Sequence, residues 1–230
     1  MIACLRFVFA FVIATAATMP AVQAQDAAVI YVVSYFDTQP SAKGEVGALL
    51  KGYRDAARKE SGNLRAEVLQ NEARPGQYVV ATAWKDQQAL DAHTAAATTK
   101  DFREKIKAQR ISPQDDRVHT GLSVGPIASA DAARGIYVVT HVDVVPPRKD
   151  DAVGLLKAFG DASRKDDGNV RYEIVQQTNR PNHFTVIEAW KSRKAFDSHT
   201  AAAPVREFHD KLQPMSGALY DERLYRLVSK

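Results

Sequence analysis

The sequence predicts an α+β fold in which one small domain occurs twice, and three observations carry this prediction. Trp84 and His93 return as Trp190 and His199, and subtracting 84 from 190 or 93 from 199 gives 106 in both cases. The same offset aligns the two halves throughout without a gap. Each half shows the same order of apolar patterns and turn residues, and a repeat of ~100 residues is the size of a whole domain.

The 230-residue chain has the composition of an ordinary globular protein, with 45% hydrophobic and 25% charged residues. Its 31 basic and 27 acidic residues give a net charge of +4, and the two signs are interleaved along the chain. A nucleic-acid interface needs a concentrated basic face. We therefore expect no nucleic-acid partner.

Residues 1–24 have the pattern of a signal peptide: Arg6, an apolar run over residues 7–17, and the small-residue sequence Ala21-Val22-Gln23-Ala24. Cleavage after Ala24 is predicted, which places the mature protein in the periplasm or outside the cell. The run is shorter than the ~20 residues of a membrane span, so none is expected in the mature chain. Cleavage removes Cys4, the single cysteine, so packing must stabilise the fold without disulfides.

The predicted domains cover residues 25–124 and 135–230, with a linker of small residues at 125–134. Each domain opens with a β-branched and aromatic strand, at 29–37 and 136–143, which is apolar on both faces. A helix with apolar residues at helical spacing follows from Glu45 and, in the second domain, from about Ala152. Gly62 and Gly168 are predicted to end these helices, because glycine tolerates a left-handed backbone.

A hairpin follows in each domain, with strands at 64–71 and 170–177 and a proline-containing turn before the strand that ends at the tryptophan. Asp86 and Ser192 are predicted to cap a short helix that carries the histidine. Pro204 should force Ala203 out of helical geometry, so that a separate helix begins there. The last strands are predicted at 117–124 and 223–228.

This order of elements is βαββαβ, the ferredoxin-like arrangement. An open antiparallel sheet with helices on one face leaves its other face uncovered, and the second copy can cover it. We therefore expect the two domains to pack sheet to sheet within one chain.

The chain resembles the antibiotic biosynthesis monooxygenase, or dimeric α/β-barrel, family in motifs that occur in both copies. These are Glu60-Ser61-Gly62-Asn63-Leu64-Arg65, Trp84-Lys85-Asp86 with Ala89 and His93, Asp167-Gly168-Asn169-Val170-Arg171-Tyr172-Glu173, and Trp190-Lys191 with Ala195 and His199. The resemblance implies small, mostly homodimeric proteins. Some of them oxygenate quinols or polyketide-derived aromatics without metal or flavin, others degrade heme, and many have no assigned activity.

A fused pair of such domains implies an intramolecular dimeric α/β barrel, and we expect a monomer with this internal pseudo-dimer. The sequence departs from the family at one position. Members often carry a second histidine five residues after the first, where this chain has Thr98 and Pro204. The resemblance therefore implies no acid/base role for residues 98 and 204.

Cofactor-independent oxygenation needs a substrate that can be deprotonated, a nearby base and an apolar cavity that excludes water. His93 and His199 are candidate bases, and Trp84 and Trp190 are candidate cavity walls. The alternative is structural: each histidine attaches a helix to the sheet by hydrogen bonds, and each tryptophan packs in the core.

The second copy adds two titratable candidates, His141 in place of Tyr35 and Glu188 in place of Thr82. By strand parity Glu188 should share the face of Trp190, where burial could raise its pKa enough for it to act as a base. The alternative for Glu188 is an ion pair with Arg171 or a nearby lysine. Because of these additions we expect any active cavity to lie in the second copy.

Two functions remain open from the sequence. One is an exported monooxygenase of small aromatic or quinol-like substrates that needs no cofactor. The other is a non-catalytic envelope protein that binds a small apolar ligand or is related to stress. Heme binding through His209 is a further alternative, since one histidine can ligate heme iron. No motif for a metal site occurs, so no metal is expected.

Overall fold

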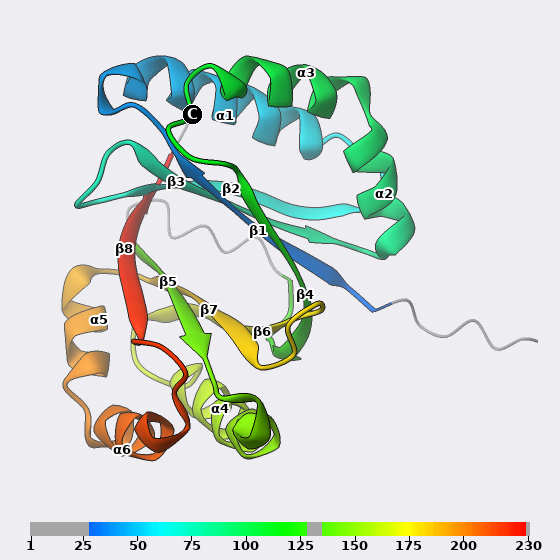
Figure 1. Ribbon diagram of the computed structural model, residues 1–230. Coiled ribbons are helices and arrows are strands. Elements are labelled where there is room, and N and C mark those ends of the chain that lie inside the picture. Colours follow the sequence, from blue (N-terminus) through cyan, green and yellow to red (C-terminus); the bar gives the residue numbers. More distant parts are fainter. Residues whose placement is uncertain (1–27, 128–134, 229–230) are drawn as a thin grey trace, which may run out of the picture.

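The computed structural model describes residues 28–127 and 135–228, which form one barrel with helices outside it (Figure 1). The helices of the first half cover one side of the barrel, and those of the second half cover the opposite side. The predicted signal peptide, residues 1–24, lies outside the described residues, as does most of the predicted linker. No helix among the described residues has the length and apolar character that crossing a membrane requires.

Both halves contain the predicted elements in the predicted order. The first half consists of β1 (Ile30–Asp37), η1 (Pro40–Ala42), α1 (Lys43–Ala57), β2 (Asn63–Asn71), β3 (Gln77–Trp84), α2 (Gln87–Ala95), α3 (Ala97–Lys107) and β4 (Asp115–Ser123). The second consists of β5 (Ile136–Asp143), η2 (Pro146–Arg148), α4 (Lys149–Ser163), β6 (Asn169–Gln177), β7 (His183–Trp190), α5 (Arg193–Thr200), α6 (Ala203–Leu212), η3 (Gln213–Met215) and β8 (Asp221–Leu227).

The eight strands form a closed antiparallel barrel in the order β1-β3-β2-β8-β5-β7-β6-β4. The last strand of each half joins the two halves: β4 pairs with β1 of its own half and with β6 of the other, and β8 pairs with β5 and with β2. The predicted intramolecular barrel is confirmed. Hydrogen bonds between the sheet edges hold it closed, in addition to the packing of the sheet faces.

Alternating residues of the strands face the barrel interior or the helices. On β7, Phe184, Val186 and Trp190 pack against residues of α4, α5 and α6 in the outer core of the second half. Ile187 and Ala189 lie between them in sequence and pack in the barrel interior. Each half therefore has its own core under its helices, and the two halves share a third core inside the barrel.

Gly62 and Gly168 have the predicted left-handed backbone, with φ of 89° and 80°. The prediction that they end the helices was wrong, because α1 ends at Ala57 and α4 at Ser163, and each glycine lies in the turn just before the next strand. A Cβ at these positions would lie only 2.7 Å from Ala89 Cβ or 2.5 Å from Ala195 Cβ. Glycine therefore permits both the turn and the close approach of the next short helix.

The predicted helix caps are confirmed. Asp86 accepts a hydrogen bond from the backbone N–H of Ala89, and Ser192 accepts one from that of Ala195. The prediction for Ala203 was wrong by one residue, because the extended residue is Ala202, with ψ of 149°, and Pro204 lies within the first turn of α6. Ala96 makes the same break in the first half without a proline, with ψ of 142°.

Four charged side chains meet inside the barrel. Arg65 binds Glu173 with both guanidinium Nη atoms, and Arg171 binds Glu67 in the same way. All four are buried. Burial opposes ionisation of Glu67, but Arg171, together with Arg65 and Arg58, outweighs it and lowers the pKa of that carboxyl group. The alternative that paired Glu188 with Arg171 is wrong, because Arg171 points into the barrel and Glu188 lies on the helix side.

Candidate active site

A cavity of about 150 Å³ lies between the sheet and the helices of the first half. Tyr53 of α1, His93 of α2 and Arg103 of α3 reach it from the helices. The other residues that line it are Val32, Ser34, Val80, Thr82, Leu90, Thr94, Asp116 and Val118. An apolar cavity of ~150 Å³ can hold a benzene ring, so this space suits one aromatic ring.

His93 is the centre of a hydrogen-bonded chain beside this cavity. Its Nδ1 lies 2.9 Å from Glu60 Oε2, and its Nε2 lies 2.7 Å from the hydroxyl oxygen of Tyr53. Because a carboxylate only accepts, Nδ1 carries the ring proton and Nε2 accepts from Tyr53. Burial lowers the pKa of His93, although Glu60 opposes the shift. The neutral ring therefore presents a basic nitrogen to the hydroxyl group that it contacts.

Trp84 packs against His93, with ring centroids 4.4 Å apart, and its Nε1 donates to Thr82 Oγ1 at 2.9 Å. The indole is fully buried between β3 and the helices. These contacts fix the plane of the imidazole and exclude water from one side of it. The structure thus brings together two of the predicted site residues, Trp84 and His93.

The second half repeats the histidine but not the full series of hydrogen bonds around it. His199 Nδ1 lies 2.7 Å from Asp166 Oδ2, and its ring packs against Trp190 with centroids 4.6 Å apart. Phe159 stands where Tyr53 stands in the first copy, so His199 lacks the tyrosine hydroxyl as a partner. Bulkier residues also occupy this half, with Phe196 at the position of Leu90 and Tyr172 at the position of Ala66.

Glu188 lies beside Trp190, as strand parity predicted, and accepts a hydrogen bond from its Nε1 at 2.8 Å. The carboxyl group is buried. Burial raises its pKa to about 8, the Trp190 hydrogen bond opposes the rise, and Glu222 adds to it. Glu188 is thus a protonated acid near neutral pH. It contacts Trp190, which in turn packs against His199.

His141 lies in a different place from the other candidates. It faces the barrel interior with Tyr137 and Val139, because its β7 partner is Thr185, whereas Glu188 pairs with Val138 on the helix side. The structure therefore does not bring His141 and Glu188 into one cavity. We expected an active second copy partly because it adds His141 and Glu188. Since these two residues do not share a cavity, they do not support that expectation as a pair.

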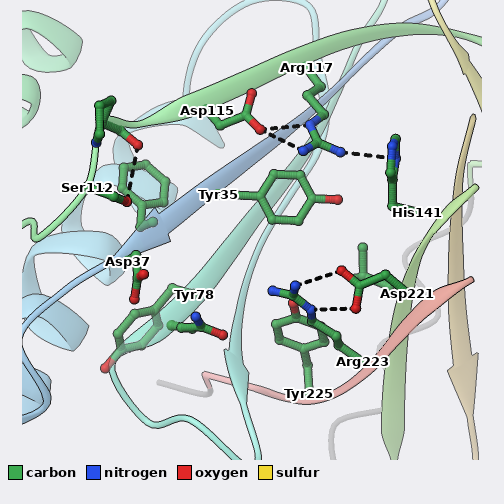
Figure 2. Close-up of a pocket in the computed structure, with 14 residues that line it drawn as sticks. Tyr35, Asp37, Tyr78, Ser112, Asp115, Arg117, His141, Asp221, Arg223 and Tyr225 are labelled. Carbon is green, nitrogen blue, oxygen red and sulfur yellow. Dashed lines mark hydrogen bonds and ion pairs between the residues drawn. The ribbon is translucent and has the colours of Figure 1, made fainter. Parts of the chain in front are cut away.

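Figure 2 shows the cavity of about 250 Å³ at the mouth of the barrel, where Tyr35 and Arg117 project toward His141. Arg117 donates from Nη1 to His141 Nδ1 at 3.0 Å, and His141 Nε2 lies 3.2 Å from His183 Nδ1. Burial and Arg117 lower the pKa of His141 to about 4. A neutral imidazole whose two nitrogens both have protein partners is held in place in this mouth.

His209, the residue of the heme alternative, contacts the Tyr220 ring edge-on, with centroids 4.7 Å apart. Within the described parts of the chain, no group of three or more His, Cys, Asp or Glu side chains is placed to hold a metal ion. Sequence reasoning missed Tyr53, Glu60, Arg103 and Asp116 as site residues. The helical spacing of Tyr53 is the same for a core residue and for a residue that lines a cavity.

The sequence profile described as "Antibiotic biosynthesis monooxygenase" matches residues 29–105 and 135–211, which together are more than half of the chain. The chain belongs to the antibiotic biosynthesis monooxygenase family. Both matches include the strand that ends in tryptophan and the histidine that follows it, so the family signal covers the candidate site of each copy.

Two curated proteins are similar to part of this chain. "Putative monooxygenase YcnE" of Bacillus subtilis (strain 168) is 23% identical over 86 residues, which are 37% of this chain and 90% of that protein. "Uncharacterized protein sll1783" of Synechocystis sp. (strain ATCC 27184 / PCC 6803 / Kazusa) is 25% identical over 93 residues, 40% of this chain. This match spans only 63% of that protein's length.

Solved structures of the family fold cover both copies. A protein of Fusobacterium nucleatum superposes with a TM-score of 0.78 at 15% identity, covering 89% of this chain and 94% of that one. A protein of Lactobacillus acidophilus gives a TM-score of 0.73 at 15% identity, covering 88% and 95%. At such identities the likeness shows the fold alone, and it confirms the barrel of two fused ferredoxin-like units.

Proposed function

We propose that this family member is a monooxygenase that oxidises a small aromatic or quinol-like molecule in the cavity of its first copy. The observation that carries the proposal is the chain Glu60–His93–Tyr53, which places a neutral imidazole nitrogen beside a cavity of about 150 Å³. Trp84 shields one side of the imidazole from water. The cavity suits one ring, and the base suits a phenolic hydroxyl group.

The proposed reaction begins when a substrate hydroxyl replaces Tyr53 at His93 Nε2 and transfers its proton to that nitrogen. Glu60 stabilises the resulting imidazolium through the Nδ1 hydrogen bond. The electron-rich phenolate then reacts with molecular oxygen. For a hydroquinone, one oxygen atom forms a new ring C–O bond and the other leaves as water. The products are a hydroxyquinone and water, and the substrate itself supplies all four electrons, so the proposal includes no flavin or metal.

The competing function is a binding protein without catalysis. The second copy favours this function. There His199 keeps its contacts with Asp166 and Trp190 but has no tyrosine hydroxyl as a partner. An imidazole in that arrangement attaches α5 to the loop after α4 and to β7. If His93 does the same and no more, the cavity binds an aromatic ring without oxidising it.

Oxygen consumption decides between the two functions. Metal-free protein is mixed with a panel of hydroquinones, and the rate without protein is subtracted. The matched variants are His93→Ala, and His199→Ala combined with Glu188→Gln, each checked for folding by circular dichroism. We expect His93→Ala to lose at least about a hundredfold in kcat, the effect typical of a positioned base, and the double variant to keep its rate.

Two other outcomes of this assay would contradict the proposal. Loss confined to the double variant would move the site to the second copy, as the sequence first suggested. Absence of protein-dependent oxygen uptake across the panel, with ring binding retained, would replace the monooxygenase by the binding protein.

We also propose that the protein is exported and begins at Gln25 after cleavage of residues 1–24. The support is the sequence pattern that ends in Ala21-Val22-Gln23-Ala24. N-terminal sequencing of the protein from a native periplasmic or culture fraction tests it. An intact Met1 on protein recovered from the cytoplasm would contradict export.

A further inference from the structure

Among the residues that the structure describes, Arg103 is the one cationic side chain that lines the first-copy cavity. It belongs to α3, and the exposed residue Thr94 and Asp116 of β4 line the same cavity. Arg103 is 42% exposed and Asp116 is 36% exposed, so both are accessible from solvent. The guanidinium group therefore lies at the solvent-exposed part of the cavity lining, whereas His93 is buried.

The guanidinium of Arg103 is only weakly engaged. Its Nη2 lies 3.7 Å from Asp116 Oδ2, which is too long for a hydrogen bond. Among residues 28–127 and 135–228 Arg103 has no other ion pair or side-chain hydrogen bond. By contrast, Arg117 lies 2.7 Å from Asp115 and Arg223 lies 2.6 Å from Asp221. Arg103 therefore keeps its N–H donors free for a ligand.

We propose that Arg103 binds a carboxylate of the substrate, so that the first copy acts on hydroxylated aromatic acids. This inference rests on the proposed function of the cavity, because it uses the same ring position. The ring occupies the cavity, one hydroxyl group reaches His93 Nε2, and the carboxylate lies at the mouth. A bidentate contact of guanidinium and carboxylate is stronger than the long contact with Asp116 that it replaces.

Arg103 lies close enough to His93 and Tyr53 to influence the pKa of both side chains. Arg103 is among the groups that hold the pKa of His93 below its usual value, although burial is the larger cause. It also opposes the rise that burial produces in the pKa of Tyr53. His93 and its hydrogen-bond partner Tyr53 are therefore both within reach of the same positive charge.

The second copy lacks this cation. His209 stands at the position of Arg103, and burial lowers its pKa, so the imidazole is neutral near pH 7. Glu222 stands at the position of Asp116, and burial raises its pKa. The charged mouth is a property of the first copy alone.

Binding is measured first, with ligands that need no turnover. Isothermal titration compares 3-hydroxybenzoate and 3-hydroxyphenylacetate with phenol on the full chain. We expect the acids to bind more tightly than phenol, and Arg103→Gln to weaken the acids by about tenfold or more while leaving phenol unchanged. Asp116→Asn should tighten the acids severalfold because it removes a competing carboxylate. Lys107→Gln removes an exposed positive charge from the same helix and should change neither ligand.

Turnover gives the second arm, with 2,5-dihydroxybenzoate and 2,5-dihydroxyphenylacetate compared with neutral hydroquinone. Arg103→Gln should raise KM for the acids and change KM for hydroquinone much less. Equal affinity of phenol and the acids for the unmodified protein, or equal losses for both in Arg103→Gln, would overturn the inference. Acid binding that depends on Arg103 without any oxygen uptake would support the inference and contradict the proposed function.

Discussion

Arg65 and Glu173, 108 residues apart in sequence, form a two-fold hydrogen-bonded ion pair inside the barrel, with distances of 2.8 and 2.6 Å. Arg171 of the second copy and Glu67 of the first copy form the equivalent ion pair, with distances of 3.0 and 2.7 Å. Each arginine therefore binds the glutamate of the other copy. Four charges balance one another in a space that the surrounding strands close off from water.

This arrangement predicts different results for single and double substitutions. Arg65→Met should lower the free energy of unfolding by about 3–5 kcal/mol, since it leaves a buried carboxylate without its partner. Arg65→Met combined with Glu173→Met should recover much of that loss, because the remaining pair is neutral as a unit. Urea unfolding of the two variants measures both values. A double variant as unstable as the single one would contradict this account.

The pKa of Glu188 predicts a specific pH dependence of stability. The unfolded chain ionises Glu188 near 4.5, whereas the folded chain keeps the proton until about pH 8. Between these values the folded state holds a proton that the unfolded state has released, so its stability falls as pH rises. Glu188→Gln should remove this fall, which we expect to be on the order of a few kcal/mol between pH 5 and 8.

The measurement compares unfolding free energies of the two proteins at several pH values. Glu207→Gln, at an exposed position on α6, is the matched control and should follow the unmodified protein. Parallel curves for the unmodified protein and Glu188→Gln would show that the carboxyl group is ionised at its ordinary pKa.

The two glycines with positive φ predict a contrast with a third glycine. Gly62→Ala and Gly168→Ala should each destabilise the protein by about 1 kcal/mol or more, because the new methyl group meets Ala89 or Ala195 and the backbone is left-handed. Gly154→Ala, within α4 and with open space around its Cβ, should stabilise by about 0.5–1 kcal/mol. Thermal unfolding of the three variants tests the order.

The closure of the barrel predicts how one half behaves alone. Residues 25–125 contain β2 and β4, whose outer edges pair with β8 and β6 in the whole chain. Exposed edges of this kind pair with other chains. We expect the isolated half to form a dimer or to aggregate, whereas the whole chain is a monomer. Light scattering distinguishes these states, and a stable monomeric half would contradict the prediction.

Local patterns in the sequence predicted most of the fold. Apolar spacing located the helices and strands, the 106-residue offset identified the repeat, and Asp86 marked where α2 begins. Gly62 marked the turn before β2 and not the end of α1, which lies at Ala57. The pairing of β4 with β6 and of β8 with β2 depends on contacts between distant residues, and no local pattern encodes it. The break between α2 and α3 at Ala96 likewise could not be predicted, because no proline follows it.

The candidate site was predicted only in part. Period-two alternation placed Glu188 with Trp190, but whether His141 shares their face depends on the register of β5 against β7. His93 was recognised because titratable residues are conspicuous in a sequence. Its partners Tyr53 and Glu60 come from α1 and the loop after it, and only the packing of α2 on α1 brings them to the imidazole.

The shared strands β4 and β8 also affect how the two sites can change. In a homodimer of single domains, every substitution occurs twice in the assembled barrel. In this chain a replacement such as Thr82 by Glu188, or Arg103 by His209, occurs once, and the unchanged copy can still supply the partner strands. One half can therefore lose or alter its chemistry while it continues to complete the barrel on which the other half depends.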